Sequence, residues 1–162
     1  MKATAIVYTS NTGFTAQYAN LLGEKTGLPV YALEQAPKGL QGSVIYLGWL
    51  MAGFVKDYKK AARQFEIAAV CGVGLCDTGT MLDTVRKNNA VPDHVPVFTL
   101  QGGMELSKLQ GPYKFAIRML TKAVAGKKNP TEDDKRMLYL LQTGGCYVSE
   151  SNLSAVLEWF VQ

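Results

Sequence analysis

A cluster of hydroxyl and amide side chains follows the first apolar segment of the chain. This loop consists of Ser10, Asn11, Thr12, Gly13, Phe14 and Thr15. A loop between a strand and a helix presents unpaired backbone N–H groups and the positive end of the helix dipole, so it attracts an anion. Three hydroxyls add donors, a glycine lets the backbone approach closely, and no lysine is present. These features predict a phosphate site of neutral donors; the alternative is that the hydroxyls only cap the helix.

The N-terminal segment resembles the flavodoxin family. The family pattern is an aliphatic-aliphatic-aromatic triplet followed by spaced small, hydroxyl and aliphatic residues, which this chain matches with Ile6-Val7-Tyr8, Ser10, Gly13, Thr15, Ala19 and Leu22. The resemblance covers most of the chain. It implies that FMN is the cofactor and that its phosphate binds at residues 10–15.

The resemblance also implies two loops that face the flavin ring. The loop after the third expected strand supplies Gly48, Trp49, Leu50, Met51 and Ala52, and the loop after the fourth supplies Gly74, Leu75, Cys76 and Asp77. Two alternatives stay open: Trp49 packs against the next helix, or Asp77 caps the following helix. Electron-carrier flavodoxins usually place a tyrosine in the second loop, and this chain has none there.

A basic helical insert is expected at about residues 102–130. Lys114, Arg118 and Lys122 recur every four residues and form one stripe on a helix that is otherwise largely apolar. Such a stripe is a solvated face, a surface for peripheral contact with an anionic membrane, or a site for an acidic partner or anionic substrate.

The segment 98–130 has a narrower resemblance to flavodoxin-type, menaquinone-dependent protoporphyrinogen oxidases. It rests on Gln101-Gly102-Gly103-Met104-Glu105, on Lys108-Leu109 and on the hydrophobic-basic helix that ends at Gly126. This resemblance implies an anionic porphyrinogen substrate and an electron acceptor in the membrane.

The elements that position these residues alternate along the chain. We expect strands at 3–8, 29–33, 43–48, 67–74 and 95–100, and helices at 13–25, 54–65, 80–89, 112–125, from 131 to the Gly144-Gly145 break, and 151–162. Strands separated by helices favour parallel pairing. The prediction is one α/β domain, 1–162, with a flavodoxin-like five-stranded doubly wound sheet, helices on both faces and the extra insert after the fifth strand.

The net charge and the few cysteine and histidine residues restrict the functions that we expect. The net charge is +4, whereas electron-carrier flavodoxins tend to be strongly acidic. Cys71 is expected to be a buried thiol and His94 a surface turn residue, and no metal site, catalytic side chain or nucleic-acid partner is expected. We therefore expect a cytoplasmic FMN-dependent oxidoreductase, with contact at the inner membrane face as an option. The alternatives are a one-electron carrier and a flavin-free interaction module.

Overall fold

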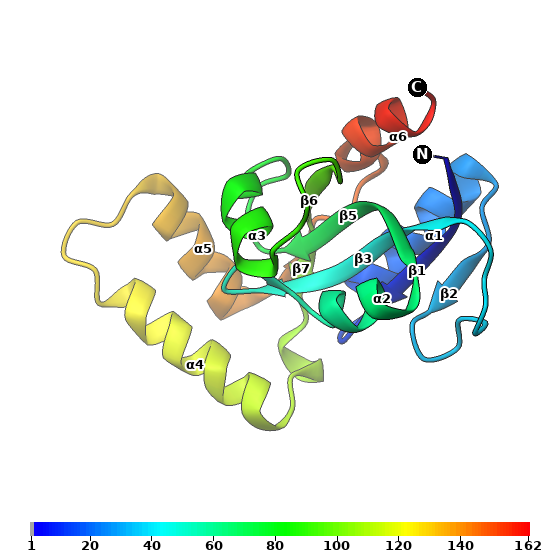
Figure 1. The fold of residues 1–162 in the computed structure, drawn as a ribbon. Helices are drawn as coiled ribbons and strands as arrows, with labels where there is room; N and C mark the ends of the chain where they lie inside the picture. The colour runs from blue at the N-terminus through cyan, green and yellow to red at the C-terminus, as the bar shows by residue number, and fades with distance from the viewer. Residues whose placement is uncertain (1) are drawn as a thin grey trace.

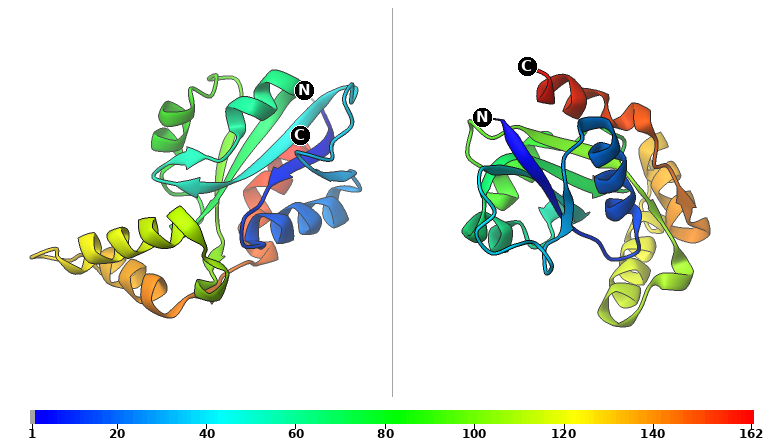
Figure 2. Two further views of the ribbon diagram at one scale, coloured as in Figure 1. Left: turned by 90° about the horizontal axis from the view of Figure 1, so that it is seen from below. Right: turned by 90° about the vertical axis from the view of Figure 1, so that its right-hand side faces the viewer.

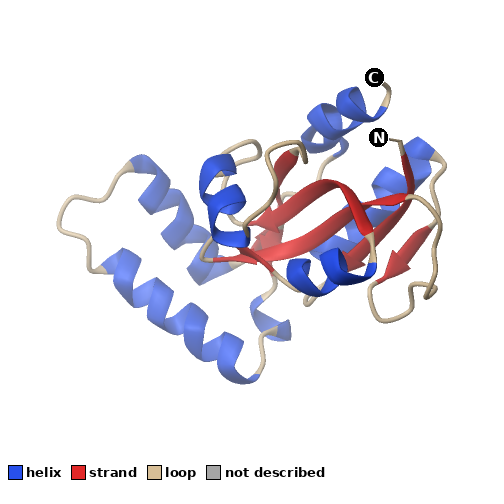
Figure 3. Ribbon diagram, viewed as in Figure 1, coloured by secondary structure: helices blue, strands red, loops and turns tan. Residues whose placement is uncertain are grey.

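The computed structural model describes residues 2–162 and is built on a mostly parallel sheet flanked by helices (Figures 1 and 3). The parallel strands lie in the order β2-β1-β3-β5-β6. Their bounds are β1 Ala3–Thr9, β2 Val30–Ala32, β3 Ser43–Met51, β5 Glu66–Gly74 and β6 Val97–Gln101. A sixth strand, β4 (Phe54–Val55), pairs antiparallel with the end of β3, so the expected count of five omits one strand.

Helices cover both faces of this sheet, as the two further views show (Figure 2). Helices α1 (Phe14–Thr26) and α6 (Ser154–Phe160) share one apolar core with the sheet, which contains Tyr18, Leu22 and Val156. Helices α2 (Tyr58–Gln64) and α3 (Leu82–Asn89) share the core on the opposite face, which contains Tyr58, Ala61 and Val85. Because β5 is covered on both faces, its sequence is almost continuously apolar rather than alternating.

The segment after residue 48 differs from the sequence prediction. Residues 49–51, expected in a loop, extend strand β3, and Phe54–Val55, expected to start a helix, form β4. Ala52 and Gly53 make the turn between the two strands, both with positive φ (50° and 78°), as two-residue hairpin turns of type I′ require. The helix that was expected from residue 54 begins only at Tyr58.

The last third of the chain adds a pair of helices at the carboxyl ends of the strands. Strand β7 (Gly103–Met104) and the short helix η1 (Leu106–Lys108) lead into α4 (Gly111–Ala125), which packs beside α5 (Glu132–Thr143). The two helices extend away from the sheet (Figures 1 and 2) and share a small apolar cluster of Met104, Val124 and Leu141. Strand β8 (Gly145–Cys146) then pairs antiparallel with β7 in a separate two-stranded sheet.

Two helix starts in this region carry sequence signals. Thr131 caps α5: its hydroxyl accepts from the Asp134 N–H at 3.1 Å, and the Asp134 carboxylate accepts from the Thr131 N–H at 3.0 Å. The helix expected at 151–162 is instead a short 3₁₀ helix, η2 (Glu150–Leu153), followed by α6. Ser149 caps η2 by accepting from the Ser151 N–H at 3.3 Å.

Candidate functional site

Ser10 organises the loop between β1 and α1. Its hydroxyl oxygen accepts hydrogen bonds from the Gly13 N–H at 3.2 Å and from the Ala16 N–H at 3.4 Å. These bonds satisfy two of the backbone donors at the start of the helix. The capping explanation therefore applies to Ser10.

The other donors of the loop have no partner within the described residues. The backbone N–H groups of residues 11, 12, 14 and 15 have no protein acceptor in that part of the chain. The Thr15 hydroxyl makes no hydrogen bond to the described residues, and because none of their buried side-chain polar atoms lacks a partner, this hydroxyl is open to the cavity that its side chain lines. Because α1 has its N-terminus here, these donors coincide with the positive end of the helix dipole.

Gly13 is required by the path of the backbone. Its φ is 104°, a left-handed conformation that side-chain-bearing residues adopt at a cost. A Cβ at this position would meet no protein atom within 4 Å. The glycine is therefore not needed to avoid a clash with other protein atoms. It is needed because the turn from β1 into α1 requires a positive φ at this position.

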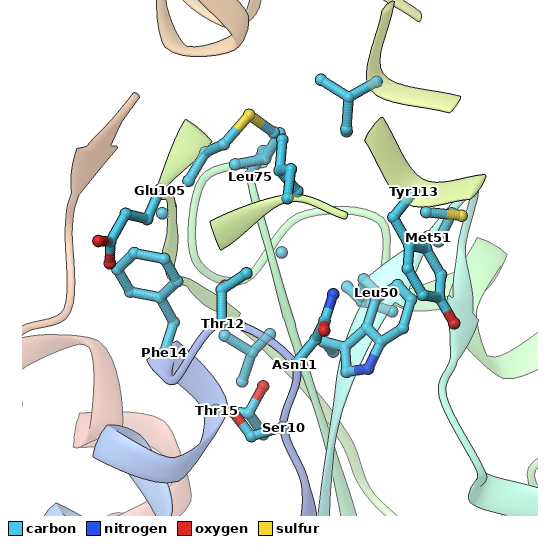
Figure 4. Close-up of a pocket in the computed structure, with 17 residues that line it drawn as sticks. Ser10, Asn11, Thr12, Phe14, Thr15, Leu50, Met51, Leu75, Glu105 and Tyr113 are labelled. Carbon is cyan, nitrogen blue, oxygen red and sulfur yellow. The ribbon is translucent and has the colours of Figure 1, made fainter. Parts of the chain in front are cut away.

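A cavity of about 100 Å³ lies above this loop, at the carboxyl ends of β1, β3 and β5 (Figure 4). In Figure 4, Ser10 and Thr15 lie at its base, Phe14 and Glu105 on one side, and Leu50 and Tyr113 on the other. The residues named from the sequence that line it are Ser10, Asn11, Thr12, Phe14, Thr15, Trp49, Leu50, Met51, Gly74 and Leu75. Residues from three separate segments thus surround one space.

The remaining residues named from the sequence lie elsewhere. Gly48 is buried within β3, where a Cβ would come within 2.6 Å of a Val55 methyl group, so it makes room for the hairpin. Ala52 sits at the hairpin turn. Asp77 is exposed, and one of its carboxylate oxygens is 3.5 Å from Arg136 of α5.

A second, larger cavity of about 440 Å³ adjoins the first and shares Leu50, Met51, Gly74, Leu75 and Ile117 with it. Ala52 and Cys76 line this second cavity. None of the described residues that line the second cavity has a charged side chain. An apolar space of this kind suits the apolar body of a small molecule.

Helix α4 supplies site residues that the sequence did not reveal. The ring of Tyr113 lies edge-on to Trp49, with the centroids 5.2 Å apart and an angle of 83° between the planes. Ile117, one turn further, lines both cavities, and Leu109, which precedes α4, lines the first. Trp49 therefore does pack against a helix, but against α4 rather than the helix that follows it in sequence. No local sequence pattern predicts that these residues belong to the site, because they reach β3 only through tertiary contacts.

The charges around the site are few. Glu105 is the only charged side chain lining the first cavity among the described residues; the neighbouring Lys108, 2.8 Å away, lowers the pKa of its carboxyl. Burial raises the pKa of the Cys76 thiol, whose sulfur is 3.2 Å from the Met81 sulfur, so the thiol stays protonated and is a poor nucleophile. The site is suited to binding and orientation rather than to acid–base chemistry by its own side chains.

Other kinds of site find little support in residues 2–162. His94 is exposed in a turn, as expected, and no group of three or more metal-ligating side chains gathers among these residues. Cys71 is fully buried, which confirms the expectation of a core thiol. Within the same range, none of the helices is both long and apolar enough to cross a bilayer. No family model, curated protein or solved structure matches this chain.

Proposed function

We propose that this chain is a flavodoxin-like oxidoreductase that binds FMN at the carboxyl ends of β1, β3 and β5. The observation that carries the proposal is the set of unpaired neutral donors at the start of α1, above all the Thr15 hydroxyl, which opens to the cavity. Donors that face one cavity and have no protein acceptor are free to donate to a ligand bound in it. A phosphate offers several acceptor oxygens to such a group of donors.

The strand order supports the same proposal. Counted along the parallel strands alone, the sheet runs 2-1-3-4-5, which is the order of flavodoxin-like doubly wound folds. In such sheets ligands bind outside the carboxyl ends of the strands, where the winding direction reverses. That reversal falls between β1 and β3, and the donor loop follows β1.

The ring of the flavin requires more room than the first cavity offers. About 100 Å³ is well below the roughly 300–1,000 Å³ of a typical small-molecule site. The donors fit the phosphate, and Trp49, Leu50, Met51 and Tyr113 provide apolar and aromatic walls for the ring. Tyr113 would therefore move aside on binding to make room for the ring, which leaves the adjoining 440 Å³ cavity for a substrate.

When bound, FMN supplies the capacity to accept and pass on electrons. The chain contributes orientation through the donor loop, and it excludes water through the apolar walls. The uncharged second cavity favours an enzyme with a small-molecule substrate over a one-electron carrier, because a carrier needs no substrate cavity. Its lining also favours an apolar substrate there over an anionic porphyrinogen.

The test is a pair of matched variants, Thr15→Val and Thr26→Val. Thr26 lies at the opposite end of α1, where its hydroxyl donates to the Leu22 carbonyl oxygen at 2.7 Å. A hydrogen bond to a charged group is worth about 1.5–3 kcal/mol, so Thr15→Val should weaken FMN binding by about tenfold or more. Thr26→Val should leave the affinity unchanged in a fluorescence titration with FMN.

Equal FMN affinity in the wild type and Thr15→Val would contradict the proposed phosphate site. If the wild-type protein is colourless and does not quench added FMN, the flavin-free module replaces the redox proposal. A reductive titration then separates the two redox functions. Loss of the flavin absorbance in one two-electron stage supports the oxidoreductase, and loss in two stages supports the carrier.

A further inference from the structure

We infer that the outer face of α4 is a docking surface for an anionic lipid bilayer. This surface, called here the α4 face, consists of Lys114, Phe115, Arg118, Met119 and Lys122 of α4 together with Leu106 of the preceding η1. The inference does not depend on FMN binding, because none of these residues lines the donor-loop cavity.

The three cations of the α4 face are exposed, and none forms an ion pair with the described residues. Neighbouring lysines do have partners: Lys108 pairs with Glu105 at 2.8 Å and Lys127 with Asp134 at 2.5 Å. Helix α4 itself contains no acidic residue in its 15 positions. The positive charge of this stripe is therefore left for a partner outside the chain.

Large apolar side chains lie beside these cations. Phe115 is 66% exposed and Met119 is 51% exposed. At 3.6 residues per turn, Phe115 and Met119 follow one another along the helix and adjoin the row of Arg118 and Lys122. Exposed aromatic and aliphatic side chains grouped in this way mark a surface that another apolar phase covers.

The other side of the cationic row is also apolar. An open groove of about 520 Å³ runs between α4 and its neighbours, and its walls include Leu106, Leu109 and Leu141 together with the three cations. Leu106 is itself 38% exposed. The row of positive charges is thus flanked by apolar surface on both sides.

This arrangement fits a bilayer interface better than an acidic protein. A helix lying in the interface buries its apolar side chains among the acyl chains, while lysine and arginine extend to anionic headgroups beside them. A folded acidic partner would instead need a shape that matches a long, convex helix. Figures 1 and 2 show α4 along the outer edge of the molecule, where a flat surface can reach its whole length. The net charge of +4 adds long-range attraction to anionic lipid.

The experiment is sedimentation of the full chain with vesicles of phosphatidylcholine alone or with about one-third phosphatidylserine. The variant Lys114→Gln/Arg118→Gln/Lys122→Gln removes the cationic row. The control variant Lys38→Gln/Lys59→Gln/Arg63→Gln removes three other exposed cations that form no ion pair with described residues, so both variants have the same net charge. Phe115→Ser/Met119→Ser tests the apolar part.

We expect binding to the anionic vesicles only, and its loss as salt is raised. At about 1 kcal/mol per basic residue near the surface, the first variant should bind on the order of 100-fold more weakly, and the control within a few-fold of the wild type. The serine variant should also bind more weakly, at unchanged charge. FMN affinity should be the same in all four proteins, so a failure of docking is distinguishable from a failure of the proposed function.

Three outcomes would overturn the inference. The first is no pelleting of the wild-type protein with anionic vesicles. The second is an equal loss of binding in the two charge variants, which would indicate net charge rather than the α4 face. The third is binding to soluble poly-glutamate through the same residues without binding to vesicles, which would assign the face to an acidic protein.

Discussion

The Asn89 side chain holds the β3–β4 hairpin against α3, because its Oδ1 accepts a hydrogen bond from the Val55 N–H at 2.9 Å. Its Nδ2 donates to the Gly53 carbonyl oxygen at 2.9 Å and to the Val85 carbonyl oxygen at 2.7 Å. Asn89 is 5% exposed, so water cannot replace these bonds. The end of β3 carries Trp49 and Met51 of the candidate site, so this buried amide helps to hold the site in place, together with the pairing of β3 with β4 and β5.

Replacing Asn89 by alanine should reduce the free energy of unfolding by about 2–3 kcal/mol, because it leaves buried backbone groups of the hairpin unpaired. Asn88→Ala is the matched control: the Asn88 amide makes one hydrogen bond, at 3.2 Å to the exposed Ala52 carbonyl oxygen, and should cost less than about 0.5 kcal/mol. Urea unfolding of both variants measures the difference. Similar losses in the two variants would contradict the assigned role of Asn89.

The hairpin is also where the sequence prediction was wrong. The pattern from Phe54 to Phe65 reads as a helix because its second half is one, and two residues of β4 are too few to show alternation. Only one of the two turn residues is a glycine. The other residue with a positive φ is Ala52, and alanine is not a residue type that predicts such a turn. Tertiary hydrogen bonds from Asn88 and Asn89 support that turn, and neither is visible in local sequence.

The sequence predicted those parts of the candidate site that come from contiguous residues. The donor loop is a contiguous strand–loop–helix segment, so its residue types and order suffice to locate it. Parallel pairing also brings the ends of β3 and β5 beside it, which follows from the alternation of strands and helices. Tyr113 and Ile117 were missed because the return of α4 over this edge depends on the β7–β8 pairing, between segments far apart in sequence.

The three thiols should react in a fixed order with a chromogenic disulfide reagent. Cys146 is exposed, Cys76 is half-buried and Cys71 is fully buried. We expect one fast equivalent, one slower equivalent, and a third only after urea unfolding, since the thiolate is the reactive form and burial suppresses it. Cys146→Ser should abolish the fast phase alone. A third equivalent that reacts in the native protein as fast as the others would contradict the buried position of Cys71.

Stability at alkaline pH should fall in a way that depends on Cys71. Burial raises the pKa of its thiol from the ordinary value of 9.0 to about 12. Above pH 9.0 the unfolded thiol loses its proton while the folded thiol keeps it, so the unfolded state is favoured increasingly up to about pH 12. Below pH 9.0 the thiol is protonated in both states and contributes no pH dependence.

Cys71→Ala should therefore lose less stability than the wild type between these two pH values, although it is less stable near neutrality because the core loses an atom. Burial also raises the pKa values of Tyr18, Tyr46 and Tyr58, which adds the same alkaline loss to both proteins. The difference between the two urea-unfolding curves, followed against pH, isolates the thiol. Parallel curves over this range would contradict the prediction.

The two glycines at the ends of α1 provide the sharpest test of the donor loop. Gly13 and Gly27 both have positive φ, 104° and 71°, and a Cβ at either would meet no protein atom within 4 Å. Gly13→Ala and Gly27→Ala should each cost about 1–2 kcal/mol of unfolding free energy, from backbone strain alone. Only Gly13→Ala should weaken FMN binding, because it alters the turn that aims the unpaired N–H groups.

Urea unfolding and an FMN fluorescence titration on both variants check this prediction. Equal FMN affinities in the two variants, at similar losses of stability, would count against the donor loop as the phosphate site. Both substitutions place a side chain at a residue with positive φ, and both lie at an end of the same helix, α1. A difference in affinity between two equally destabilised proteins then reports the geometry of residues 10–15 rather than the stability of α1.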